Sequence, residues 1–185
     1  LLAGVDEAGR GPLAGPVVVA AVVLGSNFPE IEIDDSKKIS SKKRDEFFDI
    51  IKTQALAYKI TIVSPETIDK LNIFHATMYG MEQSVLALPH LPELSLIDGN
   101  KVPAKIGLIS KAIVKGDGKY ASIAAASILA KVTRDRIMQK MHRKYPQYNF
   151  AQHKGYPTKE HLSLLRKYGA CKIHRRSYKP VREVL

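Results

Sequence analysis

An uninterrupted apolar run, residues 16–24, is the feature that most limits what this chain can form. It is rich in β-branched valine and lies between Gly15 and a Gly25-Ser26-Asn27 turn, a pattern typical of a β-strand. The run is far shorter than the roughly 20 residues that a helix needs to cross a bilayer. A segment of similar character begins at Gly4-Val5, so we expect two strands of one sheet, joined by a turn around Gly9-Arg10-Gly11-Pro12.

The rest of the chain alternates between helical and strand patterns. Residues 57–63 alternate as a half-buried strand does, which would complete a meander. Shorter strands are expected at residues 94–97 and 112–114. Helices are expected after the cap candidates Ser40 and Ser41, from the Ser64-Pro65 cap, and over residues 74–88, 122–137 and 158–168. With no internal repeat, low-complexity segment or Gly/Ser-rich linker, residues 1–185 are predicted to form a single α/β domain.

The charge balance favours a polyanionic partner. Lys and Arg number 29 against 18 Asp and Glu, giving a formal net charge of +11 and a pI near 9.7. Charge alone also fits binding at a membrane surface or simple solubility. The single cysteine, Cys171, excludes a disulfide framework and indicates a reducing cytosol. Acidic residues soon after the start of the sequence argue against a signal peptide. A cytoplasmic, non-membrane protein is expected.

Four acidic residues occur where a predicted strand gives way to a loop. Asp6 and Glu7 follow the first strand, Asp98 ends a later one, and Asp117 lies in a Gly-flanked turn. Converging carboxylates repel one another unless a hard cation neutralises them, so a site for Mg²⁺ or Mn²⁺ is predicted. The alternative is that Asp98 is only a turn former and Asp117 only a helix cap. The adjacent pair is harder to explain that way, because one of two neighbouring strand residues points to each face.

The opening block, residues 4–16, resembles the signature of the type 2 ribonuclease H family, bacterial ribonuclease HII. Six further blocks match in order: Asp35-Ser36-Lys37-Lys38, Ile97-Asp98-Gly99-Asn100, Lys115-Gly116-Asp117, residues 124–135, His153-Lys154-Gly155-Tyr156 and Ile173-His174-Arg175-Arg176-Ser177. The resemblance covers essentially the whole chain. Related type 3 enzymes usually carry a lysine where this chain has Arg10 and have a long additional N-terminal domain; neither feature is present, so the type 2 form is expected.

The resemblance implies a ribonuclease H-like fold, a central mixed five-stranded sheet flanked by helices, with residues 140–185 as a helical part that contacts nucleic acid. It also implies that Asp6, Glu7, Asp98 and Asp117 are the catalytic, metal-binding acids of a two-metal site. The implied activity is cleavage of the RNA strand of RNA/DNA hybrids and incision 5′ of single ribonucleotides in duplex DNA. The products would carry 3′-hydroxyl and 5′-phosphate ends, as ribonucleotide removal in replication and repair requires.

Substrate recognition is expected at two loops. The resemblance implies that the loop Gly9-Arg10-Gly11 reads the ribose 2′-hydroxyl, where glycine permits close approach. It implies that Tyr156 stacks beside the junction sugar, the alternative being loop packing. Basic residues are candidates for phosphate contacts, with a solvated charged surface as the alternative: Lys37, Lys38, Lys115, Lys154, Arg175 and Arg176.

Other functions are less favoured. His153, His161 and His174 match no compact zinc-ligand spacing, so a zinc site is not expected. A different metal nuclease on the same fold, or a basic nucleic-acid-binding protein without catalysis, are the alternatives. The chain is expected to be a monomer. A replication clamp is a possible partner, but no clamp-binding motif is evident.

Overall fold

The computed structural model describes residues 1–29 and 39–185. The two lysines expected to contact phosphates, Lys37 and Lys38, lie outside the described residues. Five strands form one mixed sheet: β1 (Leu2–Ala8), β2 (Val17–Val23), β3 (Ala57–Val63), β4 (Leu94–Asp98) and β5 (Ser110–Ile113), in the order β3-β2-β1-β4-β5. β2 is antiparallel to β1 and β3, whereas β4 is parallel to β1 and β5. The predicted meander and mixed five-stranded sheet are confirmed.

The helices begin largely where the sequence places a cap. They are α1 (Ser41–Gln54), α2 (Pro65–Leu71), α3 (Ile73–Leu86), α4 (Ala121–Lys144), α5 (Phe150–His153), α6 (Lys159–Tyr168) and α7 (Lys179–Arg182), with 3₁₀ turns at Ala104–Ile109, Gly116–Gly118 and Pro146–Tyr148. The side chains of Ser40, Ser64 and Thr158 accept the first-turn amides of α1, α2 and α6. Helix α4 runs past its predicted end at residue 137, because its later turns pack on the C-terminal segment, where Met138 is buried.

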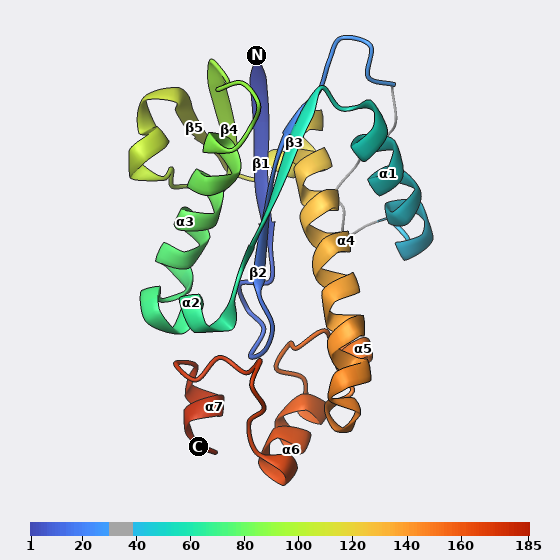
Figure 1. The fold of residues 1–185 in the computed structure, drawn as a ribbon, viewed down its shortest axis with the longest axis vertical. Helices are drawn as coiled ribbons and strands as arrows, with labels where there is room; N and C mark the ends of the chain where they lie inside the picture. Colours follow the sequence, from blue (N-terminus) through green and yellow to red (C-terminus); the bar gives the residue numbers. More distant parts are fainter. Residues whose placement is uncertain (30–38) are drawn as a thin grey trace.

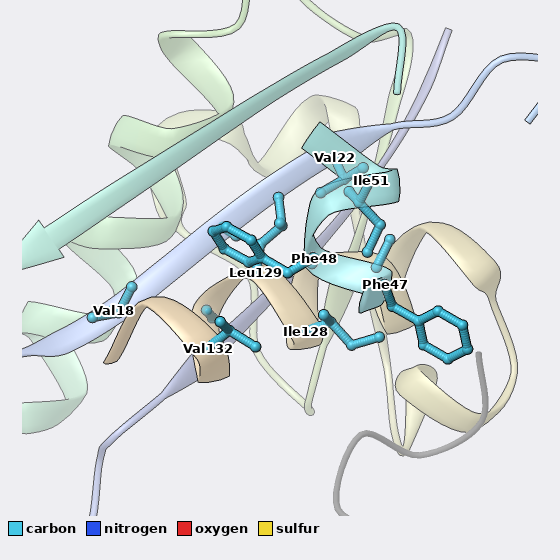
Figure 2. Close-up of a cluster of buried hydrophobic side chains, with 12 residues drawn as sticks. Val18, Val22, Phe47, Phe48, Ile51, Ile128, Leu129 and Val132 are labelled. Atoms are coloured by element: carbon cyan, nitrogen blue, oxygen red, sulfur yellow. The ribbon is translucent and has the colours of Figure 1, made fainter. Parts of the chain in front are cut away.

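Strand β2 explains why residues 16–24 contain no polar residue. Val18, Ala20 and Val22 face α1 and α4, where they pack with Phe48, Ile51 and Leu129 among others (Figure 2). Alternate residues point the other way, so Val19, Ala21 and Val23 pack with Met81 and Val85 of α3. Because helices cover both faces of the sheet (Figure 1), a strand inside the sheet is buried on both sides, and its sequence is apolar at every position.

Helix α4 lies unusually close to β1. A Cβ atom added at Gly4 would be 2.1 Å from the Ser122 carbonyl carbon, so only glycine allows this approach. The small residues Ala124, Ala125 and Ala126 continue the close contact along the helix and are buried. The beginning of α4 is therefore held directly against the strand that carries Asp6 and Glu7.

The C-terminal elements gather at one end of the sheet: α5 and α6 lie near the last turns of α4, and α7 lies below α2 (Figure 1). An isolated β-bridge joins His174 to Ala14, in the connection between β1 and β2. In the described part of the chain, no helix is long and apolar enough to cross a membrane.

Candidate active site

Asp6 and Glu7 lie inside β1, not after it as expected. The strand continues to Ala8 because both acids pair across the sheet, Asp6 with Ala20 and Glu7 with Val19. Strand alternation sends their side chains to opposite faces. Asp6 is only 6% exposed, and its Oδ1 accepts a hydrogen bond from the Glu7 amide at 2.7 Å. The strand thus presents one buried and one half-buried carboxylate.

Asp98 joins this pair from the neighbouring strand. In the parallel pairing of β1 and β4, Val5 is opposite Ile97, so the next residues along, Asp6 and Asp98, are adjacent across the two strands. Asp98 Oδ1 accepts a hydrogen bond from the Gly116 amide at 2.6 Å, which fixes its carboxylate. Asp6 and Asp98 therefore lie on adjacent strands near their carboxyl ends, and Glu7 is next to Asp6 in β1, so the charges of both neighbours act on Asp6.

The electrostatics of this cluster centre on Asp6. Burial raises the pKa of the Asp6 carboxyl well above its ordinary value, and the charges of Glu7 and Asp98 raise it further. Hydrogen bonds from the Glu7 amide and Ser127 act in the opposite direction. Such a cluster favours either a proton or a cation. Its donors are carboxylate oxygens, which are the ligands that Mg²⁺ and Mn²⁺ prefer, so the residues present fit a hard divalent cation.

Asp117 lies beside the cluster without completing it. It is in the 3₁₀ turn Gly116–Gly118, whose first amide binds Asp98, and its own Oδ1 accepts from the Gly118 amide at 3.0 Å. Within residues 1–29 and 39–185, no three Asp, Glu, His or Cys side chains stand at metal-ligand spacing. Asp117 thus directly follows the residue whose amide binds Asp98, but the structure does not bring the carboxylates of the four acids together at metal-ligand spacing.

The Gly9-Arg10-Gly11 loop forms one wall of a cleft of about 440 Å³ next to the acids. The cleft is lined by Glu7, Ala8, Gly9, Arg10, Gly11, Ser127, Lys131 and Tyr156. Gly9 has a positive φ of 96°, and a Cβ there would be 2.1 Å from Arg134 Nε, so this position requires glycine. Arg10 Nη1 lies 3.8 Å from Glu7 Oε1. The loop and Tyr156, which is 40% exposed, therefore line the same cleft as Glu7.

The basic residues expected at phosphates are placed very differently from one another. Lys115 and Arg176 are exposed, whereas the Lys154 ammonium is partly buried and donates to the Ala151 carbonyl at 2.6 Å. Arg175 is 0% exposed and donates to carbonyl oxygens of Gly9, Arg10 and Gly15. The expectation that Arg175 contacts a phosphate is wrong for this structure, because its donors already bind the protein backbone.

Sequence reasoning missed three residues at the site. Ser127 and Lys131 line the cleft from α4, and Arg134, one turn further along, is buried beneath it at 1% exposure. A signal was available for Arg134: it lies seven residues after Ser127 and four before Met138, which are both buried, so helical periodicity puts an arginine on the inward face.

Comparison with known proteins identifies the family. The family model described as Ribonuclease HII matches residues 3–181. A ribonuclease HII from Burkholderia pseudomallei (strain 668) is 55% identical over 183 residues, covering 99% of this chain and 85% of that protein. The chain belongs to the ribonuclease HII family. This ribonuclease HII is thus a hydrolytic endoribonuclease of a family that acts on RNA/DNA hybrids, and the expected recognition is confirmed.

Solved structures agree on the fold of this ribonuclease HII. A ribonuclease H2 from Pyrococcus horikoshii has a TM-score of 0.84 at 29% identity, covering 99% of this chain and 96% of that one. A ribonuclease HII from Archaeoglobus fulgidus, solved in a complex with PCNA, has a TM-score of 0.84 at 27% identity, covering 100% and 96%. Bst-RNase HIII, solved with Mn²⁺, is more distant, with a TM-score of 0.71 at 16% identity, covering 99% of this chain and 68% of that longer one. It supports the fold alone.

Proposed function

We propose that this ribonuclease HII incises duplex DNA on the 5′ side of single embedded ribonucleotides, besides cleaving the RNA strand of RNA/DNA hybrids. The observation that carries the proposal is a single cleft that is lined by the Gly9-Arg10-Gly11 loop, by Tyr156 and by Glu7, the neighbour of the buried Asp6. A group that distinguishes RNA from DNA must contact the sugar 2′-hydroxyl. A backbone loop within a few ångströms of the catalytic carboxylates can make that contact at the nucleotide being cut.

Asp6, Glu7, Asp98 and Asp117 would hold the metal ions, Mg²⁺ or Mn²⁺. Bound metal ions would supply activation of water and stabilisation of charge on the phosphate and on the leaving oxygen. Asp6 would be the central ligand, since it is the most buried acid and lies beside Glu7 and Asp98. Hydrolysis of this kind leaves 3′-hydroxyl and 5′-phosphate ends, with the 2′-hydroxyl used for recognition.

Other residues would bind and orient the duplex. Tyr156 lies against Gly11, whose position for an added Cβ is 3.6 Å from the ring, and both line the cleft, so a sugar bound in the cleft would contact both. Exposed Lys115 and Arg176, with Lys37, Lys38 and the partly buried Lys154, would bind phosphates, which position a duplex without reading its sequence. Binding should then weaken steeply as the salt concentration rises.

The proposal is tested with a labelled DNA duplex that carries one ribonucleotide, with Mg²⁺ or Mn²⁺ and with EDTA. The matched all-DNA duplex is the control, and a long RNA/DNA hybrid is the reference substrate. We expect a metal-dependent cut on the 5′ side of the ribonucleotide and none in the control.

Other outcomes identify other functions. Cutting of the hybrid but not of the single-ribonucleotide duplex would contradict the proposal while leaving the family activity intact. Cutting of all-DNA duplex would indicate a less selective nuclease, and binding without any cut would indicate a non-catalytic module.

A further inference from the structure

Two buried arginines, Arg134 and Arg175, have no part in the chemistry proposed above. They are the largest side chains that are fully buried, at 1% and 0% exposure. Burying a guanidinium is costly unless its donors are satisfied. None of the ion pairs formed by the described residues involves either arginine. Their hydrogen bonds go almost entirely to backbone carbonyls, in one short stretch of chain.

Arg175 binds the Gly9-Arg10-Gly11 loop from the interior of the protein. Its Nη2 donates to the Gly9 carbonyl at 2.5 Å and its Nη1 to the Arg10 carbonyl at 2.9 Å. Its Nε donates to the Gly15 carbonyl at 2.9 Å. The Tyr178 hydroxyl donates to the same Arg10 carbonyl at 2.7 Å and accepts from Arg175 Nη1 at 3.0 Å. One planar guanidinium thus spans both ends of the loop.

Arg134 links the same stretch to the loop that carries Tyr156. Its Nε donates to the Pro16 carbonyl and its Nη2 to the Ala14 carbonyl, both at 3.0 Å. Its Nη1 donates to the Lys154 carbonyl at 2.9 Å, two residues before Tyr156. The guanidinium carbon lies 5.7 Å from the centre of the Tyr156 ring, within cation–π distance. One side chain therefore joins the residues that follow the Gly9-Arg10-Gly11 loop to the residues that precede Tyr156.

These bonds determine which way the loop's amides point. In a trans peptide the carbonyl and the following N–H point in opposite directions, and the described residues contain no cis peptide. Because Arg175 holds the carbonyls of Gly9 and Arg10 on the interior side, the amides of Arg10 and Gly11 are directed away from it, toward the cleft that these residues line. A loop released from Arg175 could rotate these peptide planes freely, since its glycines impose little restriction.

We propose that Arg175 and Arg134 are positioning residues for ribose recognition, which orient the Gly9-Arg10-Gly11 amides and Tyr156 toward a ribonucleotide without touching it. The inference rests on the proposed function and adds the side chains on which its selectivity depends. A lysine would keep the positive charge but would lack the planar guanidinium with its several N–H donors. A single ammonium group cannot reach the carbonyls of Gly9, Arg10 and Gly15 at the same time. Arginine-to-lysine variants therefore separate positioning from charge.

The experiment measures ribose discrimination, defined as the ratio of Kd for an all-DNA duplex to Kd for the same duplex with one ribonucleotide. It is measured in the Asp6→Asn background, with Mg²⁺, so that the substrate stays intact. We expect Arg175→Lys and Arg134→Lys each to lower this ratio by about tenfold, while Kd for all-DNA duplex changes by no more than about twofold. Arg182→Lys, at an exposed arginine of the same C-terminal segment, is the matched control and should leave the ratio unchanged.

A purely structural role predicts a different pattern, in which both Kd values change together and in proportion to the loss of folded protein. Unfolding transitions in urea distinguish the two. Should the lysine variants fold poorly, Arg175→Ala assayed with and without methylguanidinium tests the same point, because a positioning role predicts that discrimination returns as the small cation fills the space. Discrimination that survives in Arg175→Lys, or is not restored in Arg175→Ala, overturns the positioning role. The proposed function itself is overturned by a different result: no ribose discrimination by the Asp6→Asn protein with both arginines intact, together with no cleavage of the single-ribonucleotide duplex by the unsubstituted protein.

Discussion

Asp6 carries a carboxyl group into a nearly closed part of the protein, beside the carboxylates of Glu7 and Asp98. Without a cation this arrangement destabilises the charged form, which is why the pKa of Asp6 is raised. The same side chain that would bind metal is therefore a source of instability in the metal-free protein. Function and stability make opposite demands at this one residue.

Asp6→Asn should therefore have opposite effects on stability and activity. In EDTA, removing a buried, crowded charge should raise the free energy of unfolding by about 1 kcal/mol, or about 2–4 °C in Tm. Mg²⁺ should raise the Tm of the unsubstituted protein but much less that of the variant, because metal that binds only the folded state stabilises it. Metal-dependent cleavage should be lost. Thermal melts with and without Mg²⁺ check this, and equal stabilisation of both proteins would contradict the role of Asp6 as a ligand.

Three histidines gather near the Tyr156 loop although their spacing in sequence gives no sign of it. The Cys171 amide donates to His174 Nδ1 at 3.0 Å, so His174 carries its proton on Nε2. That nitrogen lies 3.0 Å from His161 Nε2, which must accept, so His161 Nδ1 donates to the Tyr156 carbonyl at 2.9 Å. The chain of bonds requires both rings to be neutral, and burial, with the other ring's charge in the case of His174, lowers the pKa of each to about 4.

This histidine pair should make the protein sensitive to acid. The unfolded histidines take up protons below their ordinary pKa of about 6.5, whereas the folded ones do so only near 4. The free energy of unfolding is thus unaffected by the pair above pH 6.5 and falls as pH drops from 6.5 toward 4, by about 1–2 kcal/mol per histidine. Urea titrations at pH 7 and pH 5 measure this. His161→Gln should reduce the difference between the two pH values and exposed His90→Gln should not; equal differences in all three proteins would contradict the assignment.

Single residues also show where sequence reasoning reached its limit. The acids could be named as candidates because each lies close to the end of a strand pattern and within a block that resembles a family, and their role in metal binding stays a prediction. Arg175 was not, because His174-Arg175-Arg176 looks like a basic surface segment, and only bonds to carbonyls about 160 residues earlier bury the middle residue. Burial of a charged side chain is decided by distant partners, which no local pattern records.

At the scale of elements, the strands and helices were predicted well where an apolar pattern marks the buried residues, and less well where pairing with a neighbouring strand determines where a strand begins or ends. Strand β1 extends through Asp6 and Glu7 because β2 supplies partners for both. Strand β5 begins at Ser110, two residues before its predicted start, where it pairs with Ser95 of β4. In each case the end of a strand depends on the neighbouring strand and not on its own residues.

The contact of β1 with α4 gives a prediction at this scale. Gly4→Ala would place a methyl group 2.1 Å from the backbone of Ser122, so strand and helix must separate. We expect the free energy of unfolding to fall by about 3 kcal/mol, at the upper end of the range for overpacking. The matched control is Gly107→Ala, where an added methyl group has no described atom within 4 Å, and the change should stay within about 0.5 kcal/mol. Urea unfolding compares the two, and a similar loss in both would show that close packing is not the cause.

At the scale of the whole molecule, the C-terminal segment is joined to the sheet by polar bonds as well as by apolar contacts, such as those of Leu13 with Leu165 and Val181. Arg175 binds the connection between β1 and β2, His174 bridges to Ala14, and the Ile173 carbonyl accepts from the Gly15 amide at 2.9 Å. On its other side, Asp69 of α2 accepts from the amides of Arg176 and Ser177, both at 2.9 Å. These bonds fail together if either part unfolds, which favours one cooperative unit.

The single cysteine provides a test of that unity. Cys171 lies in the C-terminal segment, and burial raises the pKa of its thiol, so reaction with a thiol reagent should be slow while the segment is folded. If residues 1–185 unfold as one domain, the urea concentration at which Cys171 becomes reactive in brief labelling pulses should equal the midpoint for loss of helical circular dichroism. Fully unfolded protein in high urea gives the reference labelling rate. Reactivity that appears at a clearly lower urea concentration would mean that the C-terminal segment unfolds separately from the rest of the protein. The hydrogen bonds from Arg175 to the Gly9-Arg10-Gly11 loop would then break in that local unfolding. Ribose discrimination should in that case decline over the same lower range of urea.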